Sequence, residues 1–117
     1  MDLENMPDIV RQFANKYRDV WDAYNHLGAV VAKAGPLDAK TERLVKLAVS
    51  VGGRREGAVR SHTRRGMALG LSRPEIEHVA LLATTTIGWP AALAALSWID
   101  DELNQAGGGT TSSGPSG

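Results

Sequence analysis

Apolar side chains recur every three or four residues along the first part of this chain, which is the spacing of an amphipathic helix. The series predicts one long helix or two short helices joined near Tyr17 and Arg18; its members are Ile9, Val10, Phe13, Tyr17, Val20, Trp21 and Tyr24. A further apolar run from Leu27 to Ala34 is ended by Gly35-Pro36, because proline does not continue a helix.

Residue types at helix boundaries predict two helices in the middle of the chain. Asp38 is a typical N-cap for a helix over about 39–51, and Gly52-Gly53 follows that segment. This helix is apolar on nearly every side, so we expect it to lie at the centre of the fold. The next helix is predicted over about 55–69, with Gly70 as its C-terminal stop.

Two more helices complete the pattern. Ser72 and Glu75 have the spacing of a capping box, which predicts a helix from there to about Ile87. Pro90 begins the last helix, because proline is tolerated in a first turn. The apolar stripe of this helix is Leu93, Leu96, Ile99 or Asp100, and Leu103. No segment has the turn residues of a strand pair, so the prediction is all-α, a single-domain orthogonal bundle of about six helices.

Length and composition limit the chemistry. The chain has 117 residues and no cysteine, which excludes disulfides, thiolate metal sites and cysteine nucleophiles. We assign one helical domain to residues 1–106 and interpret residues 107–117, which have no apolar side chain to bury, as a flexible tail or expression remnant. Self-association would help to cover a core of this size.

Charge is balanced overall but unevenly spread. The segment Arg54–Arg73 carries six arginines against Glu56 alone, whereas residues 74–117 carry five acidic residues and no basic one. Such asymmetry either pairs within or between chains, or forms a face that attracts anions.

No membrane partner is expected. The acidic N-terminus is unlike a signal peptide, and we expect a cytoplasmic protein. The run Val79–Ile99 has 21 uncharged residues, which is long enough to cross a bilayer, but Gly88-Trp89-Pro90 interrupts it.

His62 is the first candidate for chemistry. Arg55, Val59, His62, Gly66 and Leu69 follow one another at spacings of four, three, four and three, so they share one helix face. We expect this face to point inward. A half-buried imidazole beside an arginine can give or take a proton near neutral pH. The alternative is a core histidine satisfied by a carboxylate or a backbone carbonyl.

Two other residues are candidates for the same site. Glu42 lies in the first turn of its predicted helix, where it could orient His62, act as a base or favour the helix N-terminus. His78 neighbours the inward face of its helix and could line the same pocket or an interface.

Metal and nucleic-acid binding are not expected. The three histidines lack the HExxH spacing, so no metal site is predicted. Residues 67–79 resemble a helix-turn-helix, which makes DNA binding a third alternative. However, Glu75 and Glu77 would repel phosphates at the start of the second helix.

Four blocks in this order resemble the carboxymuconolactone decarboxylase family, which includes the alkyl hydroperoxidase D-type proteins. The blocks are Leu37-Asp38-x-Lys40-x-Glu42-x-Leu44-Val45-x-Leu47-Ala48, Glu56-Gly57-Ala58-x-x-x-His62, Gly70-Leu71-Ser72-x-x-Glu75-Ile76 and Gly88-x-Pro90. The resemblance covers about residues 10–104. It implies an all-helical fold that forms homo-oligomers, often trimers or hexamers, with pockets at subunit contacts.

The resemblance also implies roles for individual residues. Peroxidase members carry Cys-x-x-Cys-x-x-x-His and an upstream glutamate in a proton relay. His62 matches that histidine, and Glu42 matches the glutamate with about one residue of extra spacing. The cysteine positions fall on Arg55 and Ala58, so thiol-based peroxide reduction is excluded.

The decarboxylase branch of the family removes carbon dioxide from a lactone bearing carboxylates, without a cofactor. Such chemistry needs cations that hold the acid and a proton donor that quenches the enolate. We therefore expect His62 and Glu42 to be catalytic, and Arg55, Glu56 and His78 to bind substrate. Gly57-Ala58 departs from that branch, whose members tend to carry His-Glu there.

The predicted function is cofactor-independent decarboxylation or proton transfer on a small anionic organic acid or lactone. The alternative comes from another class of protein. It is a non-catalytic homo-oligomeric binding or scaffold protein, in which Arg55, Glu56 and His62 only pair within the core.

Overall fold

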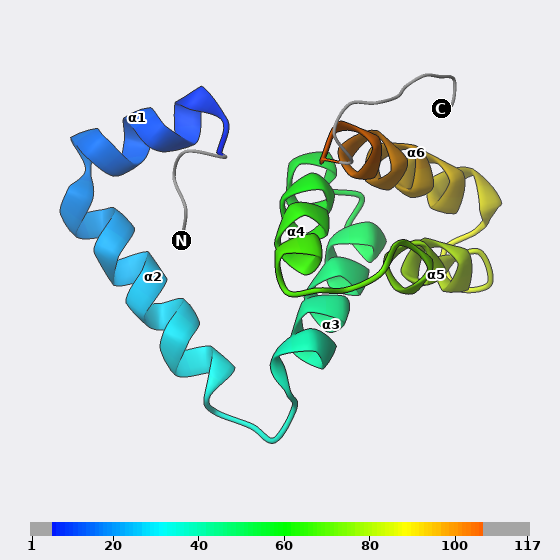
Figure 1. Cartoon of the computed structure of the whole chain (residues 1–117), viewed down its shortest axis with the longest axis horizontal. Coiled ribbons are helices and arrows are strands. Elements are labelled where there is room, and N and C mark those ends of the chain that lie inside the picture. Colours follow the sequence, from blue (N-terminus) through cyan, green and yellow to red (C-terminus); the bar gives the residue numbers. More distant parts are fainter. Residues whose placement is uncertain (1–5, 107–117) are drawn as a thin grey trace. The chain divides into compact units, whose positions relative to one another are not determined.

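The computed structural model describes residues 6–106, and in this range the chain forms helices and no strands (Figure 1). The helices are α1 (Asp8–Lys16), α2 (Arg18–Ala32), α3 (Ala39–Gly52), α4 (Glu56–Ala68), α5 (Arg73–Ala83) and α6 (Trp89–Ala106). The all-α prediction is confirmed. The predicted tail, residues 107–117, lies outside the described residues.

The chain divides into two compact units between Pro36 and Leu37. Helices α1 and α2 form the first unit, and α3 to α6 form the second. We predicted a single domain over residues 1–106, and this division into two units does not test that prediction.

In the first unit, the two-helix alternative is correct. Tyr17 leaves the helical conformation, with φ −120° and ψ 59°, and separates α1 from α2. Helix α2 then continues to Ala32, so it includes most of the apolar run that begins at Leu27. Ala14 is the buried residue of this unit among those described, whereas most large apolar side chains of α1 and α2 are exposed.

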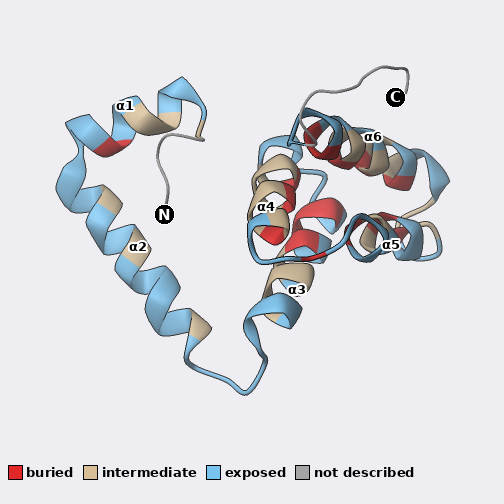
Figure 2. Ribbon diagram, viewed as in Figure 1, coloured by how far each residue is buried: buried red, intermediate tan, exposed pale blue. Residues whose placement is uncertain are grey.

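The second unit has a continuous apolar core. Helix α3 packs against α4 and α5, and α6 packs against the same two helices from another side. Figure 2 shows buried segments on all four of these helices. The largest fully buried apolar side chains are Leu47, Val51, Val59, Ile76 and Ile99.

Helix α3 is less enclosed than predicted. Leu47 and Val51 are buried, but Val45 and Val49 are 46% and 70% exposed. Only the sides of α3 that meet α4 and α5 are covered by the second unit, which leaves part of its apolar surface uncovered by its neighbours. Its N-cap is as predicted, because the Asp38 carboxylate accepts a hydrogen bond from the Thr41 backbone N–H at 2.8 Å.

Helix α4 turns a narrow face inward. Val59, Thr63 and Gly66 are buried and lie at spacings of four and three residues. A Cβ atom on Gly66 would lie 3.1 Å from Leu71 Cδ1, so glycine allows a close approach here. The prediction that Arg55 and Leu69 share the buried face is wrong. Arg55 precedes the helix with extended backbone, and both side chains are exposed.

The glycines predicted to end α3 and α4 do lie at the ends of these helices, but their backbone conformations differ. Gly70 has φ +90°, as expected of a C-terminal stop. At the end of α3, by contrast, Gly53 has φ −80°, and the left-handed residue is Arg54, with φ 56°.

Helix α5 opens with the predicted capping box but ends earlier than predicted. The Ser72 hydroxyl accepts from the Glu75 N–H, and the Glu75 carboxylate accepts from the Ser72 N–H. The helix stops at Ala83 instead of Ile87. The Thr86 hydroxyl then donates to the Ala83 carbonyl at 3.0 Å, which satisfies an acceptor at the helix end.

The uncharged run Val79–Ile99 is thus divided between α5 and α6. Gly88 has φ +95° in the turn that separates them, and α6 begins at Trp89. Its buried stripe includes Ile99 and Leu103 as predicted, whereas Leu93 is 46% exposed. Across residues 6–106, no helix combines the length and apolar character needed to cross a membrane.

Ion pairs connect α4 to α6. Glu102 is buried, and its two carboxylate oxygens accept hydrogen bonds from Arg60 and Arg64, each at 3.1 Å. Asp101 is more exposed and also pairs with Arg60. Part of the predicted charge asymmetry is therefore neutralised within the chain.

We expect Glu102→Gln to lower the free energy of unfolding by about 2 kcal/mol, because it removes the buried charge that two arginines share. Urea denaturation of both proteins in the same buffer measures this difference. Asp101→Asn is the matched control, since Asp101 pairs with Arg60 at the exposed side, and we expect it to lower stability by less than about 1 kcal/mol. Equal losses in the two variants would contradict this prediction.

Candidate functional site around His62

His62 lies on α4 where this helix packs against α3. The imidazole is half-buried, and Arg43 Nη1 on α3 donates a hydrogen bond to His62 Nδ1 at 2.8 Å. One turn further along α4, a Cβ atom on Gly66 would lie 3.7 Å from Arg43 Cγ. The absence of a side chain at Gly66 therefore leaves room for the Arg43 stem beside His62.

Basic side chains dominate the electrostatics at His62. The pKa of His62 is lowered from 6.5 to about 4, first by burial of the imidazole and then by the positive charges of Arg43, Arg65 and Lys46, in that order. The folded protein therefore holds His62 neutral at pH 7. We call Arg43, Lys46, His62 and Arg65 the basic cluster.

Arg43 is itself perturbed. Burial and the nearby Arg65 charge lower the pKa of its guanidinium, while Glu42 opposes this shift. A guanidinium nevertheless stays charged at neutral pH. Among the described residues, the buried Arg43 Nε has no hydrogen-bond partner. Arg43 thus brings a charge and an unsatisfied donor into the contact between α3 and α4.

Glu42 was predicted to orient His62, but the hydrogen bond to His62 Nδ1 comes from Arg43, the next residue along the chain. Successive residues of a helix point about 100° apart, so the two side chains leave α3 in different directions. Glu42 is half-buried, and its charge acts on the Arg43 guanidinium.

The predicted substrate-binding residues Arg55 and Glu56 lie at the start of α4, and both are exposed. Arg55 has φ −100° and ψ 94°, so it stands outside the helix and does not share the face of His62. The Glu56 carboxylate accepts a hydrogen bond from Arg60 Nε at 3.0 Å, one turn along the same helix.

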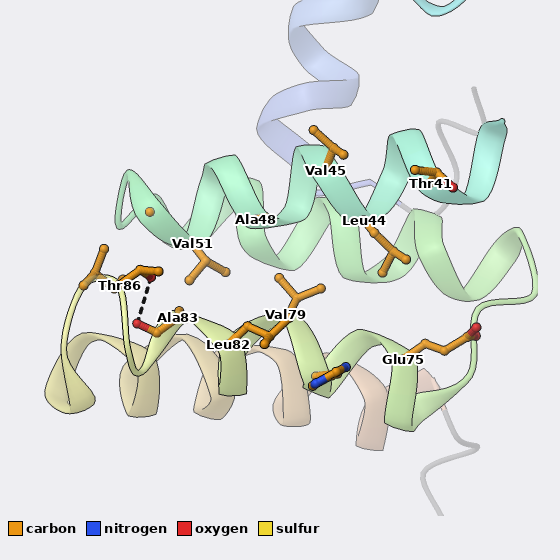
Figure 3. A pocket seen from close by; sticks show the side chains of 13 residues that line it. Thr41, Leu44, Val45, Ala48, Val51, Glu75, Val79, Leu82, Ala83 and Thr86 are labelled. Carbon is orange, nitrogen blue, oxygen red and sulfur yellow. Dashed lines mark hydrogen bonds between the residues drawn. The ribbon is translucent and has the colours of Figure 1, made fainter. Parts of the chain in front are cut away.

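His78 is exposed on α5 and lines an apolar groove of about 410 Å³ between α3 and α5. Figure 3 shows Leu44 and Val51 projecting from α3 into this groove and Val79 projecting toward them from α5. His62 does not line the groove. The structure therefore does not bring His78 and His62 into one pocket.

The donor set does not favour a metal ion. Across residues 6–106, no three histidine, aspartate or glutamate side chains gather closely enough to hold one. The basic residues around His62 would also repel a cation. This arrangement fits an anion instead.

Sequence reasoning missed Arg43, Lys46 and Arg65. Two signals were present. Arg43 and Lys46 are three residues apart on α3, and Arg65 is three residues from His62 on α4, so each pair shares a helix face. What the sequence did not show was that these two faces meet.

Comparisons with known proteins agree with this fold. The sequence model described as "Carboxymuconolactone decarboxylase family" matches residues 18–101. A crystal structure of a carboxymuconolactone decarboxylase family protein from Legionella pneumophila, solved in the apo form, is similar with a TM-score of 0.68 and 20% sequence identity; the match covers 82% of this chain and 85% of that one. No curated protein sequence matches the chain.

We expect the stability of the protein to fall as the pH is lowered from about 6.5 to 4, in part because of His62. In this window the unfolded chain binds a proton at His62 and the folded chain does not, so acid favours unfolding. His62→Gln removes this contribution. Urea denaturation at several pH values should give a smaller loss of stability on acidification for the variant.

The control for this prediction is Asp100, whose carboxyl pKa is raised by burial and by Glu77. Protonation of Asp100 therefore stabilises the folded state as the pH falls, whereas His62 destabilises it. The loss of stability on acidification should be larger for Asp100→Asn than for the parent protein, and smaller for His62→Gln. Identical pH profiles for the parent and His62→Gln would contradict the assigned environment of His62.

Proposed function

The chain belongs to the carboxymuconolactone decarboxylase family, and we propose that it carries out cofactor-independent decarboxylation or proton transfer on a small anionic organic acid or lactone at the basic cluster. The observation that carries this proposal is the half-buried His62 among three basic side chains from two helices. His62 keeps the role of catalytic residue that the sequence suggested.

The charge of the basic cluster supports an anionic substrate. Arg43 and Lys46 on α3 and Arg65 on α4 all act on His62 electrostatically. A carboxylate placed among them would be held by favourable charge interactions in a partly water-excluded site. Arg43 rather than the exposed Arg55 is therefore the clamp that we propose for the substrate carboxylate.

The same charges connect substrate binding to proton transfer. A bound carboxylate offsets the basic side chains, which raises the pKa of His62 and allows the imidazole to take a proton. In a decarboxylation, the carbon–carboxylate bond breaks and carbon dioxide leaves. The electron pair passes to an adjacent carbonyl as an enolate, and the substrate carbon then takes the proton from His62.

We expect small carboxylates or lactones to raise the melting temperature of the parent protein in a thermal-shift screen. A ligand that binds the folded state raises its melting temperature. The same compounds should give little or no shift for His62→Gln, because this variant lacks the imidazole of the proposed site. Compounds that pass this screen are then assayed for carbon dioxide release or for solvent deuterium exchange at carbon.

His26→Gln is the matched control, since it removes an exposed imidazole from α2, in the other unit of the chain. This variant should keep the ligand shifts of the parent protein. Equal ligand shifts for the parent, His62→Gln and His26→Gln would show that binding occurs elsewhere and would contradict the proposed site.

We also propose that the chain forms a homo-oligomer, as the family resemblance implies. Helix α2 carries an exposed apolar stripe, and its members are Val20, Tyr24, Leu27 and Val31, at spacings of four, three and four residues. More than half of each side chain is exposed. Such a continuous apolar surface is typical of a surface that binds another protein chain. This feature equally suits the non-catalytic scaffold alternative.

We expect the parent protein to be larger than a monomer in light scattering after size-exclusion chromatography. Leu27→Asp should shift it toward the monomer, because the charge would be buried at the contact. Ala29→Asp is the control, since Ala29 lies on the opposite side of α2 from this stripe and should leave the mass unchanged. A monomeric parent protein at all concentrations would contradict the proposal.

A further inference from the structure

The contact between Arg43 and His62 has a fixed hydrogen-bond direction. Arginine has five N–H donors and no acceptor. At 2.8 Å from Arg43 Nη1, His62 Nδ1 must therefore be the acceptor and cannot carry a proton. A neutral imidazole has one N–H, so the single proton of His62 lies on Nε2.

Adding a second proton to His62 would break this contact. It would place an N–H on Nδ1 directly against an N–H of Arg43, and it would set two cations 2.8 Å apart. The hydrogen bond and the imidazolium are therefore mutually exclusive, and Arg43 has to move away before Nδ1 can be protonated.

The other charged groups near His62 do not relieve this conflict. Lys46 from α3 and Arg65 from α4 add positive charge. The acidic side chains of α5 and α6 have other partners: Asp101 pairs with Arg60, Glu102 with Arg60 and Arg64, and both Glu77 and Asp100 with Arg73, while the Glu75 carboxylate accepts a hydrogen bond from the Ser72 N–H. On α3, the charge of Glu42 acts on the Arg43 guanidinium.

We propose that Arg43 is a positioning residue that holds His62 in a single neutral tautomer, with Nδ1 bare and the proton on Nε2, and that His62 gains a second proton only when this hydrogen bond is released. The catalytic meaning of this switch rests on the proposed function. A substrate carboxylate that draws Arg43 away would free Nδ1 and permit the protonation that the chemistry needs. Before a ligand binds, the Nε2–H of His62 is the hydrogen-bond donor that the imidazole can present to it.

The experiment is nitrogen-15 NMR of the imidazole rings without any ligand, followed from pH 7.5 to the lowest pH at which the protein stays folded. His62→Gln identifies the His62 signals. In the parent protein, we expect the Nδ1 signal of an unprotonated acceptor and the Nε2 signal of an N–H nitrogen, with protonation only near pH 4.

Arg43→Met removes the donor and keeps an unbranched stem beside Gly66. We expect its Nδ1 and Nε2 signals to move toward each other, because both tautomers become populated, and its protonation midpoint to rise toward 6.5. Arg43→Lys should restore the single tautomer, since a lysine ammonium also donates.

Lys46→Met is the matched control, because it removes one positive charge from α3 near His62 but leaves the Arg43 hydrogen bond. We expect it to raise the midpoint less than Arg43→Met and to keep the parent tautomer. The proposal would be overturned if Lys46→Met raised the protonation midpoint as much as Arg43→Met and both variants kept the parent tautomer. In that case only the positive charge would matter.

The parent spectrum decides the matter if Arg43→Met does not fold. A proton on Nδ1, or two populated tautomers, in the parent protein would overturn the proposal by itself. Because no ligand is added, these outcomes are separate from those of the ligand screen. A screen without hits would overturn the proposed function and leave the assignment of Arg43 standing.

Discussion

The second unit depends on the packing of α4 against α3 and α6, to which α4 contributes few buried apolar side chains. Its buried face consists of Val59, Thr63 and Gly66, which fills only a narrow strip between α3 and α6. Polar side chains on both sides of this strip therefore have to find partners in partly buried surroundings. Arg60 and Arg64 find them on α6, whereas His62 finds Arg43 on α3.

The two sides of α4 differ in their charge balance, and this difference locates the candidate site. Toward α6, the carboxylates of Asp101 and Glu102 neutralise arginines of α4. These ion pairs stabilise the contact between the two helices. Toward α3, three basic side chains surround an imidazole and lower its pKa. Ion pairs that are satisfied within the chain offer little to a ligand, while a cluster of basic side chains attracts an anion.

Membership of the carboxymuconolactone decarboxylase family accounts for the fold, whereas the electrostatics at His62 follow from its contact with Arg43. The sequence offered Glu42 as a residue that could orient His62, and Glu42 matched the family's glutamate with about one residue of extra spacing. In the structure the hydrogen bond to His62 comes from Arg43, so a guanidinium and not a carboxylate contacts the imidazole. A carboxylate favours a protonated imidazole, whereas a guanidinium opposes it, so the sign of the effect on the pKa of His62 is reversed.

Local signals were enough to predict most of the helices of this chain and where they begin, although α5 ends at Ala83 instead of Ile87. The capping box at Ser72 and Glu75, the stop at Gly70 and the N-cap at Asp38 act within one helical turn, so the residues themselves decide them. Which side chains meet across helices was decided only by the tertiary structure. The contact of Arg43 with His62 depends on the rotation of α3 and α4 about their axes, and the exposure of Arg55 depends on a backbone conformation that helical spacing does not report. Long-range packing sets the contact of Arg43 with His62, and no local pattern encodes it.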